Sequence, residues 1–391
     1  MTQVVIAGAK RTPIGSFQGQ FTGIPATKLG SVAIEAALTQ AGIEAKDVSE
    51  VFMGCVLPAG LGQAPARQAA LGASIPASAG CTTINKVCGS GMKAIMLGHD
   101  LIRAGSAGIV VAGGMESMTN APHLLPSGRS GIRYGSGQII DHMAWDGLTN
   151  PYDQQAMGVF GEMCVDKYGF TRQEQDQFAS ESVQRALEAV AGAFSDEIAA
   201  VEVSDRRGNK TLVATDEEPA RCDLGKIPSL RPAFSKEGTI TAATSSKISD
   251  GAAAVVLLSD VDAKARGLTV LARVVAHSTH SQAPEWFTTA PVDAIGKVLA
   301  AAGWKAEDVD LFEVNEAFAC VAMAPMRELG IDRARLNVHG GACALGHPIG
   351  ATGARITVTL IHALKATGGR RGVAALCIGG GEATALAIEL A

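Results

Sequence analysis

The segment VVAGGME at residues 110–116 returns in similar form as LCIGGGE at residues 376–382. In each copy a short apolar run leads into glycines and ends on a glutamate. Two more pairs of segments follow in the same order at nearly the same spacing: SGMKAI at 90–95 with TGARI at 352–356, and AGIEAKDV at 41–48 with AGWKAEDV at 302–309. Three matches in one order indicate that the chain consists of two related halves.

Both halves show the same order of predicted strands and helices. Each has a β-rich run, an alanine-rich helix, a short apolar strand, a glycine-flanked helix and a buried strand that runs into glycines. These elements are predicted at 4–7, 29–40, 51–54, 91–104 and 109–114 in the first half, and at 270–275, 292–302, 311–314, 353–366 and 373–379 in the second. This alternation is typical of an α/β fold with a parallel or mixed sheet covered by helices. We therefore expect two pseudo-symmetric domains.

A long segment between the two halves falls outside the repeat and is predicted to be an inserted loop domain. Its most regular part is a charged helix at 171–191, where Thr171 and Glu174 have the spacing of a capping box. Insertions of this length in compact folds usually bind or cover a ligand. The predicted divisions are 1–117 for the first half, 118–250 for the insertion, 240–265 for its return to the first half's core, and 266–391 for the second half.

Composition narrows the class of protein. The chain has 391 residues, of which 47% are hydrophobic and 18% charged, so it has the composition of a compact globular protein. A net charge of −5 predicts no nucleic-acid partner and no binding to an anionic membrane. No apolar run reaches the roughly 20 residues of a membrane span, and no signal peptide is visible, so we expect a cytoplasmic protein.

The eight cysteines show no CxxC pair and no zinc-finger spacing, so we expect reduced thiols and no metal site. Cys88 differs from the others because Gly89-Ser90-Gly91 and a predicted helix follow it. Small residues permit a sharp turn and the close approach of a substrate. A thiol at a helix N-terminus is also expected to lose its proton more easily, which favours nucleophilic attack on a thioester.

Three other residues have settings that suit the same chemistry. His347 lies among glycines in GGACALGHPIG (340–350), where it can take the proton of Cys88 and later stabilise an oxyanion. Cys377 ends a strand before Gly379, whose backbone N–H can form an oxyanion hole, and a second thiol there can act as an acid or base on carbon. Asn315, which follows a short apolar strand, can hold a water against a carbonyl oxygen, although taken alone it is better interpreted as part of a polar turn.

Together these segments are similar to those of the thiolase family, over essentially the whole chain. The motifs that carry the resemblance are, in order, NKVCGSGMKA, GGMESM, NEAF, GGACALGHPIG and CIGGG. The resemblance implies a thiolase fold, in which two pseudo-symmetric βαβαβαββ halves form a layered α/β/α/β/α core with an inserted loop domain. It also implies a homotetramer, and a reaction that needs no cofactor or metal ion, since coenzyme A is itself substrate and product.

The family resemblance also implies a division of labour in the site. Cys88 is acylated, His347 activates it, and Cys377 moves a proton on the methyl carbon of the second acetyl-CoA. Asn315, through a water, and His347 form one oxyanion hole, and the backbone N–H groups of Cys88 and Gly379 form the other. The residues expected to bind coenzyme A are Ser246, Leu148, Met157 and Phe318 along the pantetheine arm, and Arg221 at the adenine or phosphate end.

The implied reaction is a reversible ping-pong condensation of two acetyl-CoA to acetoacetyl-CoA and CoA, through acetyl-Cys88. One alternative is a degradative 3-ketoacyl-CoA thiolase of broader chain length, which the TSS run at 244–246 resembles. The segments GGMESM and PEWFTTAP (284–291) resemble acetoacetyl-CoA thiolases and favour the short chain. A ketoacyl-ACP synthase is disfavoured because Cys377 occupies the place of a third catalytic group. A non-catalytic, lipid-binding relative would have lost a reactive residue.

Overall fold

The first half of the chain forms a complete βαβαβαββ unit. The computed structural model describes residues 2–205 and 207–391. The elements of this half are β1 (Val4–Arg11), α1 (Ala26–Ala41), β3 (Glu50–Gly54), α2 (Pro65–Gly72), β4 (Gly80–Ile84), α3 (Ser90–Arg103), β5 (Val110–Ser117) and β10 (Ser249–Ser259), with the two-residue β2 (Gly15–Ser16) beside β10. Every helix and strand predicted from the repeat is present here, with ends moved by a few residues.

The second half repeats this order after a short helix, α6 (Asp260–Ala265). Its elements are β11 (Ala272–Ser281), α7 (Ala290–Ala302), β12 (Leu311–Val314), α8 (Ala319–Leu329), α9 (Ala342–Leu345), α10 (Thr352–Thr367), β13 (Arg371–Ile378) and β14 (Glu382–Leu390). Here the third strand of the unit is reduced to a single bridge between Phe312 and Leu336.

Asn337 explains why that strand stops. Its φ of 47° is left-handed, so the backbone cannot continue as a strand. Its side-chain amide instead accepts from the N–H of Val314 and donates to the same residue's carbonyl, each at 2.8 Å. One side chain thus makes the two ladder bonds that the missing strand would have made.

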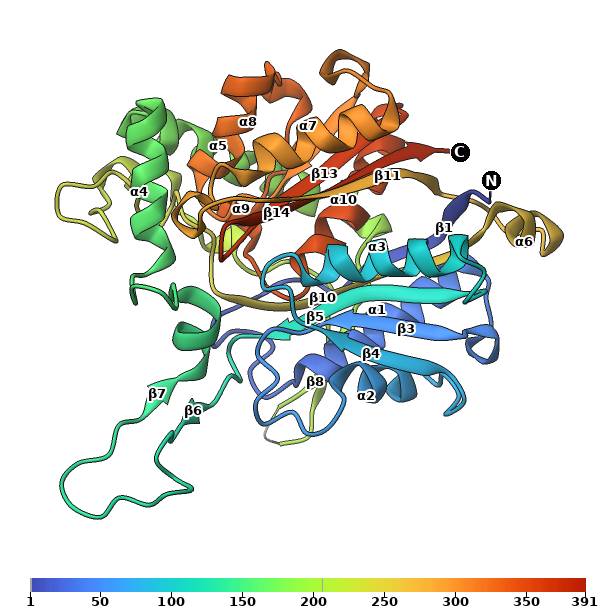
Figure 1. Cartoon of the computed structure of the whole chain (residues 1–391), viewed down its shortest axis with the longest axis horizontal. Helices are drawn as coiled ribbons and strands as arrows, with labels where there is room; N and C mark the ends of the chain where they lie inside the picture. Colours follow the sequence, from blue (N-terminus) through green and yellow to red (C-terminus); the bar gives the residue numbers. More distant parts are fainter. Residues whose placement is uncertain (1, 206) are drawn as a thin grey trace.

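A short pairing of β1 with β11 connects the two half-sheets into one sheet, and in Figure 1 the two half-sheets lie on either side of helices α3 and α10. The strand order is β12-β13-β14-β11-β1-β10-β5-β3-β4. Counted outward from the β1–β11 junction, corresponding strands of the two halves follow in the same order. The junction is a short antiparallel pairing of β1 with β11, in which Val4 lies opposite Val274. Because corresponding strands flank this junction, it marks the pseudo-two-fold axis of the molecule.

Helices divide the molecule into five layers. Helices α1 and α2 cover the outer face of the first half-sheet, and α7 and α8 cover the outer face of the second. Helices α3 and α10 pack against each other between the half-sheets, where they share one apolar core. The layers follow the expected α/β/α/β/α order, and the fold class is confirmed.

The two central helices approach very closely at their first turns. A Cβ added at Gly353 would lie 2.3 Å from the backbone nitrogen of Met92, and one at Gly91 would lie 2.8 Å from that of Ala354. Only glycine permits this approach, which explains the small residues in the repeated SGMKAI and TGARI segments. The contact also brings together the two loops that precede these helices, which carry Cys88 and His347.

The segment between β5 and β10 contains two small hairpins and two helices. Its elements are β6 (His123–Leu124), β7 (Ile140–Asp141), a π-helical turn (Met143–Leu148), α4 (Met157–Tyr168), α5 (Arg172–Val190), β8 (Val201–Ser204) and β9 (Lys210–Val213). The predicted capping box is confirmed, since Thr171 and Glu174 exchange side-chain and backbone hydrogen bonds. Helices α4 and α5 pack on α8, so much of the insertion rests on the second half.

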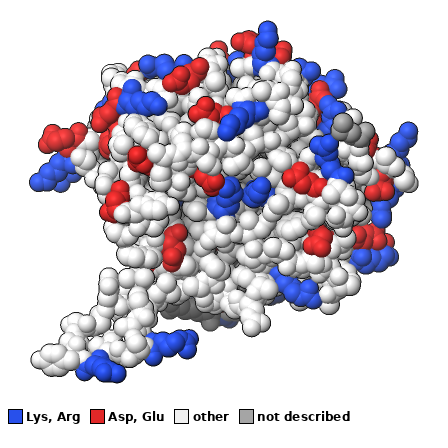
Figure 2. Space-filling view, in the orientation of Figure 1, with Lys and Arg blue, Asp and Glu red and all other residues white. Residues whose placement is uncertain are grey.

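Figure 2 shows acidic and basic side chains mixed over one face of the molecule. Among the described residues on that face there is no continuous basic stripe of the kind that binds nucleic acid. The β6–β7 hairpin projects from the body in Figures 1 and 2. Within residues 2–205 and 207–391, every helix is too short or too polar to cross a lipid bilayer.

Candidate active site

Cys88 lies in the turn between β4 and α3, and the residue before it is strained. Val87 is β-branched but has a left-handed φ of 46°, a conformation that costs energy and is typical of functional turns. The hydroxyl of Ser90 holds the turn, because it accepts from the N–H of Lys86 at 2.8 Å and donates to the carbonyl of Val87 at 2.6 Å. The nucleophile is therefore presented by a turn that its neighbours hold rigidly.

The thiol of Cys88 does not ionise easily in this structure, contrary to the expectation from its place at a helix start. Burial raises its pKa to about 11, although the backbone N–H groups of Gly379 and of Cys88 itself lower it. Desolvation thus outweighs the helix N-terminus. The thiol therefore needs a base before it can act as a nucleophile. The backbone N–H groups of Gly379 and Cys88 already lie close to its sulfur.

His347 is suited to be that base. Its Nδ1 lies 2.6 Å from the hydroxyl oxygen of Thr352, and that hydroxyl donates to the carbonyl of Pro348 at 3.0 Å. The hydroxyl's one proton is used there, so Nδ1–H donates to it and Nε2 carries the lone pair. Nε2 has no hydrogen-bond partner among the described residues. It is free to accept a proton from a substrate or a thiol.

The imidazole of His347 is neutral at physiological pH. Burial, reinforced by the charge of Arg355, lowers its pKa to about 3. Only 6% of the residue is exposed, because α9 and the central helices enclose its loop, yet it lines the wall of a cavity.

Cys377 and Gly379 come to the same place from the end of β13. Cys377 is fully buried, which raises the pKa of its thiol well above the usual value, and a charge on Cys88 raises that pKa further. A Cβ added at Gly379 would lie 3.6 Å from Val87 and 3.7 Å from the sulfur of Met157. The structure therefore brings the two cysteine loops into contact beside the insertion.

Asn315 is fully buried at the end of β12, and neither atom of its amide group has a partner among the described residues. Leaving a buried amide unsatisfied costs about 1–3 kcal/mol per group. Such a residue is well placed to hold a water or a substrate oxygen. The segment that follows Asn315 contacts the loop that carries Ser246, because the carbonyl of Ala317 accepts from the N–H of Ser246 at 3.0 Å.

An apolar cavity of about 280 Å³ begins at His347 and opens between the insertion and the second half. Four of the five residues predicted to bind coenzyme A line it. The lining consists of Met118, Leu148, Ala156, Met157, Gly158, Phe234, Ser245, Ser246, Lys247, Ile248, Phe318, His347 and Ile349. A narrow apolar channel with a few polar groups and an imidazole at one end suits an acyl-pantetheine arm.

Arg221 is not in this cavity. It lines an adjoining one of about 290 Å³ with Lys226 and Lys247, and Lys247 borders both cavities. Arg221 also forms an ion pair with Glu217 at 3.2 Å. The structure thus separates Arg221 from the apolar channel and places it in the adjoining cavity, which has more cationic side chains.

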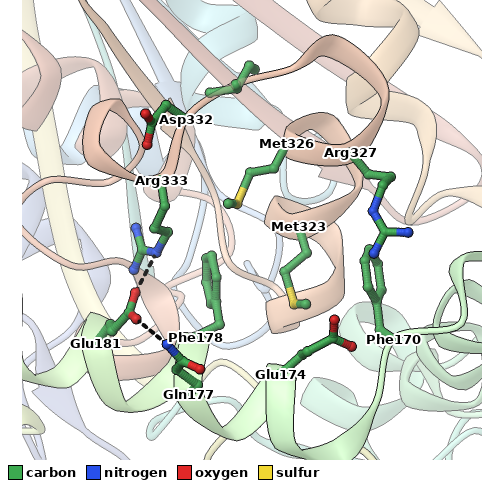
Figure 3. Close-up of a pocket in the computed structure, with 11 residues that line it drawn as sticks. Phe170, Glu174, Gln177, Phe178, Glu181, Met323, Met326, Arg327, Asp332 and Arg333 are labelled. Carbon is green, nitrogen blue, oxygen red and sulfur yellow. Dashed lines mark hydrogen bonds and ion pairs between the residues drawn. The ribbon is translucent and has the colours of Figure 1, made fainter.

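A larger cavity lies elsewhere and contains none of the predicted site residues. It measures about 570 Å³ and lies between α5 and α8, with Phe178, Met323 and Met326 in its walls (Figure 3). Its rim is closed by an ion pair between Arg333 and Glu181 at 3.1 Å. Size alone does not identify the reactive site here, because this cavity offers no nucleophile and no unpartnered base.

Two glutamates that we did not predict hold the catalytic loops, and they occupy equivalent positions of the repeat. Glu116, at the end of β5, accepts from the N–H groups of Val56, Leu57 and Gly350 at 3.0, 3.1 and 2.8 Å. Glu382, at the start of β14, pairs with Lys86 at 2.5 Å. Each half therefore holds the loop of the other. The repeated glutamate of GGME and GGGE was the signal that could have revealed them.

The fold and this site are those of a covalent acyltransferase: a thiol in a strained turn lies near a second buried thiol, and a neutral imidazole lines an apolar cavity. The chain belongs to the thiolase family. A model of the N-terminal domain of thiolase matches residues 4–261, and a model of the C-terminal domain of thiolase matches residues 268–390.

Curated relatives cover the whole chain. A probable acetyl-CoA acetyltransferase of Dictyostelium discoideum is 51% identical over 390 residues, covering 100% of this chain and 94% of that protein. Acetyl-CoA acetyltransferase 1 of Arabidopsis thaliana is 51% identical over 389 residues, covering 99% of this chain and 94% of that protein. An acetyl-CoA acetyltransferase of Cupriavidus necator is 48% identical over 391 residues and is covered completely.

Proposed function

We propose that this protein is an acetyl-CoA C-acetyltransferase, which joins two acetyl-CoA into acetoacetyl-CoA and CoA and also runs in reverse. The observation that carries the proposal is the buried pair of thiols, Cys88 and Cys377, together with His347 in the wall of an apolar cavity of about 280 Å³. The curated relatives, which share about half of their residues with this chain over its full length, support the same activity.

In the first half-reaction, Nε2 of His347 takes the proton of Cys88, and the thiolate attacks the carbonyl carbon of acetyl-CoA. The N–H groups of Cys88 and Gly379 donate to the oxyanion that forms. The bond between the carbonyl carbon and the CoA sulfur then breaks. The leaving sulfur takes a proton from Cys377, which leaves acetyl-Cys88, protonated His347 and a Cys377 thiolate.

In the second half-reaction, the Cys377 thiolate removes a proton from the methyl group of a second acetyl-CoA. The enolate oxygen is held by Asn315, through a water, and by His347. The enolate carbon attacks the acetyl carbon on Cys88, and the Cys88 sulfur leaves with the proton from His347. Every group returns to its starting protonation state, so we propose that no cofactor beyond coenzyme A takes part.

The binding of coenzyme A divides between the two cavities. Leu148, Met157, Ser246 and Phe318 enclose the pantetheine arm in the apolar channel. Arg221, with the lysines of the adjoining cavity, accommodates the anionic adenine end. Since one lysine borders both cavities, a single ligand can run from one to the other.

The direct test is to trap the acyl-enzyme. Incubation with acetyl-CoA labelled in the acetyl group is expected to leave one stable label on Cys88, and Cys88→Ser is expected to leave none. Cys81→Ser, a cysteine of the same segment outside the site, serves as the control and should label normally. Normal label on Cys88→Ser would mean that another residue is acylated and would refute the role of Cys88. Absence of label on the wild type would instead support the non-catalytic alternative.

Chain length is tested separately, by the rate of thiolysis. We expect acetoacetyl-CoA to be cleaved much faster than a ketoacyl-CoA of about ten carbons, because the apolar cavity that His347 lines has a volume of only about 280 Å³ for the pantetheine arm and the acyl chain together. Comparable rates on both substrates would instead support the degradative thiolase of broad chain length.

We also propose a homotetramer in the cytoplasm. The β6–β7 hairpin supports assembly, because Leu125, Ile132, Tyr134 and Ile139 are all exposed on it, Tyr134 completely. Exposed apolar groups on a projecting loop are typical of interfaces. The cytoplasmic location is supported by a Gibberella zeae relative, 45% identical, whose description is acetyl-CoA acetyltransferase, cytosolic.

A further inference from the structure

Two histidines and an aspartate converge at a second place, outside the active site. His99 and Asp100 lie near the C-terminal end of α3, and His277 lies on β11. Nδ1 of His99, Nε2 of His277 and Oδ1 of Asp100 form a triangle with sides of 3.2, 2.9 and 2.9 Å. Among the described residues this is the one group of three or more such side chains whose ligand atoms lie close enough to share an ion.

Hydrogen bonds alone do not satisfy this triangle. If both ring nitrogens carry a proton, each can donate to Asp100, but the two nitrogens then lie 3.2 Å apart with no hydrogen bond between them. If only one carries a proton, a lone pair of the other ring faces the carboxylate at 2.9 Å. A cation in the centre removes both conflicts, because it accepts a lone pair from all three atoms.

The distances also fit a metal ion. Ligand atoms about 2.1 Å from one ion lie about 3.0 Å apart in an octahedron and about 3.4 Å apart in a tetrahedron. The observed sides fall at and between these values. The two imidazole rings meet at an interplanar angle of 89°, so their nitrogens approach one point from different directions. We propose that His99, Asp100 and His277 bind a divalent transition-metal ion.

The ligand types select the kind of ion. Two imidazoles and one carboxylate favour zinc, cobalt or nickel over calcium or magnesium, which prefer oxygen ligands. The neighbouring cavity is lined by Arg103 and Arg273. Cationic neighbours disfavour an ion held by charge alone, so the bonds from the imidazole nitrogens must supply the affinity.

The site is reachable and it joins the two halves. Asp100 has 54% of its side chain exposed, whereas His99 has only 6%, so one ligand faces solvent and another is fixed in the core. Helix α3 belongs to the first half and β11 to the second. The ligands are 177 residues apart in sequence, which explains why no metal motif is visible in the chain. An ion here would cross-link the halves close to their junction.

Titration of the full-length protein with Co²⁺ and Zn²⁺ tests the proposal. We expect one Co²⁺ per chain with a visible absorption band of nitrogen and oxygen ligands, and a rise in melting temperature with Zn²⁺. His277→Gln and Asp100→Asn are each expected to weaken binding at least about tenfold. Circular dichroism of both variants checks that they fold.

His280→Gln is the matched control, because His280 lies on the same strand and contacts an aspartate, Asp293, at 3.4 Å. It should bind like the wild type. The proposal is overturned if both site variants bind as tightly as the control, or if the cobalt spectrum shows a thiolate band, which would mean that cysteines hold the metal. Neither readout depends on enzymatic activity.

Discussion

At the scale of single residues, the decisive feature is a pair of groups that burial keeps neutral. Burial moves the pKa of Cys88 up to about 11 and that of His347 down to about 3. Both shifts disfavour a resting thiolate–imidazolium pair. In the mechanism that we propose, the charged pair forms only during reaction, and the resting thiol is neutral and therefore less reactive.

Thr352 should matter because it sets the tautomer of His347. Thr352→Val removes the oxygen that accepts from Nδ1–H, so the ring loses its fixed orientation. We expect kcat/KM for acetyl-CoA to fall about tenfold or more, with little change in KM. Thr357→Val, on the same helix and equally buried, is the control, since its hydroxyl only bonds to Gly353. Equal effects of both substitutions would show that the loss is one of packing.

The same histidine predicts a pH dependence of stability. The folded protein protonates His347 near pH 3, whereas an unfolded histidine does so near 6.5. Between these values the unfolded chain binds more protons, so this residue's contribution to stability falls as the pH is lowered from 6.5 toward 3. We expect the urea midpoint of the wild type to fall more steeply between pH 6.5 and 5 than that of His347→Asn. Parallel curves would contradict the buried, neutral state.

At the scale of elements, the loops are held across the pseudo-symmetry axis. The glutamate that ends β5 bonds to the loop of His347, and the glutamate that begins β14 bonds to the loop of Cys88. The close crossing of α3 and α10 brings the loops together, and these two carboxylates then fix them. The catalytic geometry therefore depends on both halves being packed.

Glu116 provides the test at this scale. Glu116→Gln replaces one carboxylate oxygen by an NH₂ group, which then faces backbone donors. We expect a loss of about 2–3 kcal/mol in the free energy of unfolding and a lower kcat, because the loop of His347 loses its anchor. Urea unfolding and steady-state kinetics measure both. Glu35→Gln, exposed on α1, should change neither, and a silent Glu116→Gln would refute the anchoring role.

At the scale of the whole molecule, the projecting β6–β7 hairpin is the feature that a single chain does not explain. It carries four exposed apolar side chains, Leu125, Ile132, Tyr134 and Ile139. We expect Tyr134→Ser combined with Ile139→Ser to lower the assembly state in sedimentation experiments, while each chain stays folded. Leu212→Ser, which removes an exposed apolar group from a different hairpin, is the control. An unchanged tetramer in the double variant would place the interface elsewhere.

Much of the fold and of the reactive set could be predicted from the sequence. The repeat of VVAGGME as LCIGGGE and of SGMKAI as TGARI revealed two halves, because each half must bury the same strand and pack the same helix. Cys88, His347 and Cys377 were visible for a local reason: each lies beside glycines, which a turn or a close approach requires. Leu148, Met157, Ser246 and Phe318 were placed by family resemblance, and all four line one channel.

Other features were decided only by the tertiary structure, because they depend on groups that the sequence keeps far apart. Desolvation reversed the pKa shift expected for Cys88, and no local pattern measures burial. Among the described residues of the second half, the third strand of the implied βαβαβαββ unit is missing, and the side chain of the left-handed Asn337 makes its hydrogen bonds to Val314. Arg221 lies in an adjoining cavity, apart from the channel that the other four predicted residues line, and no local pattern showed this separation. The loop-holding glutamates and the cluster of His99, Asp100 and His277 exist only because the two halves pack against each other, which places their polar atoms within bonding distance.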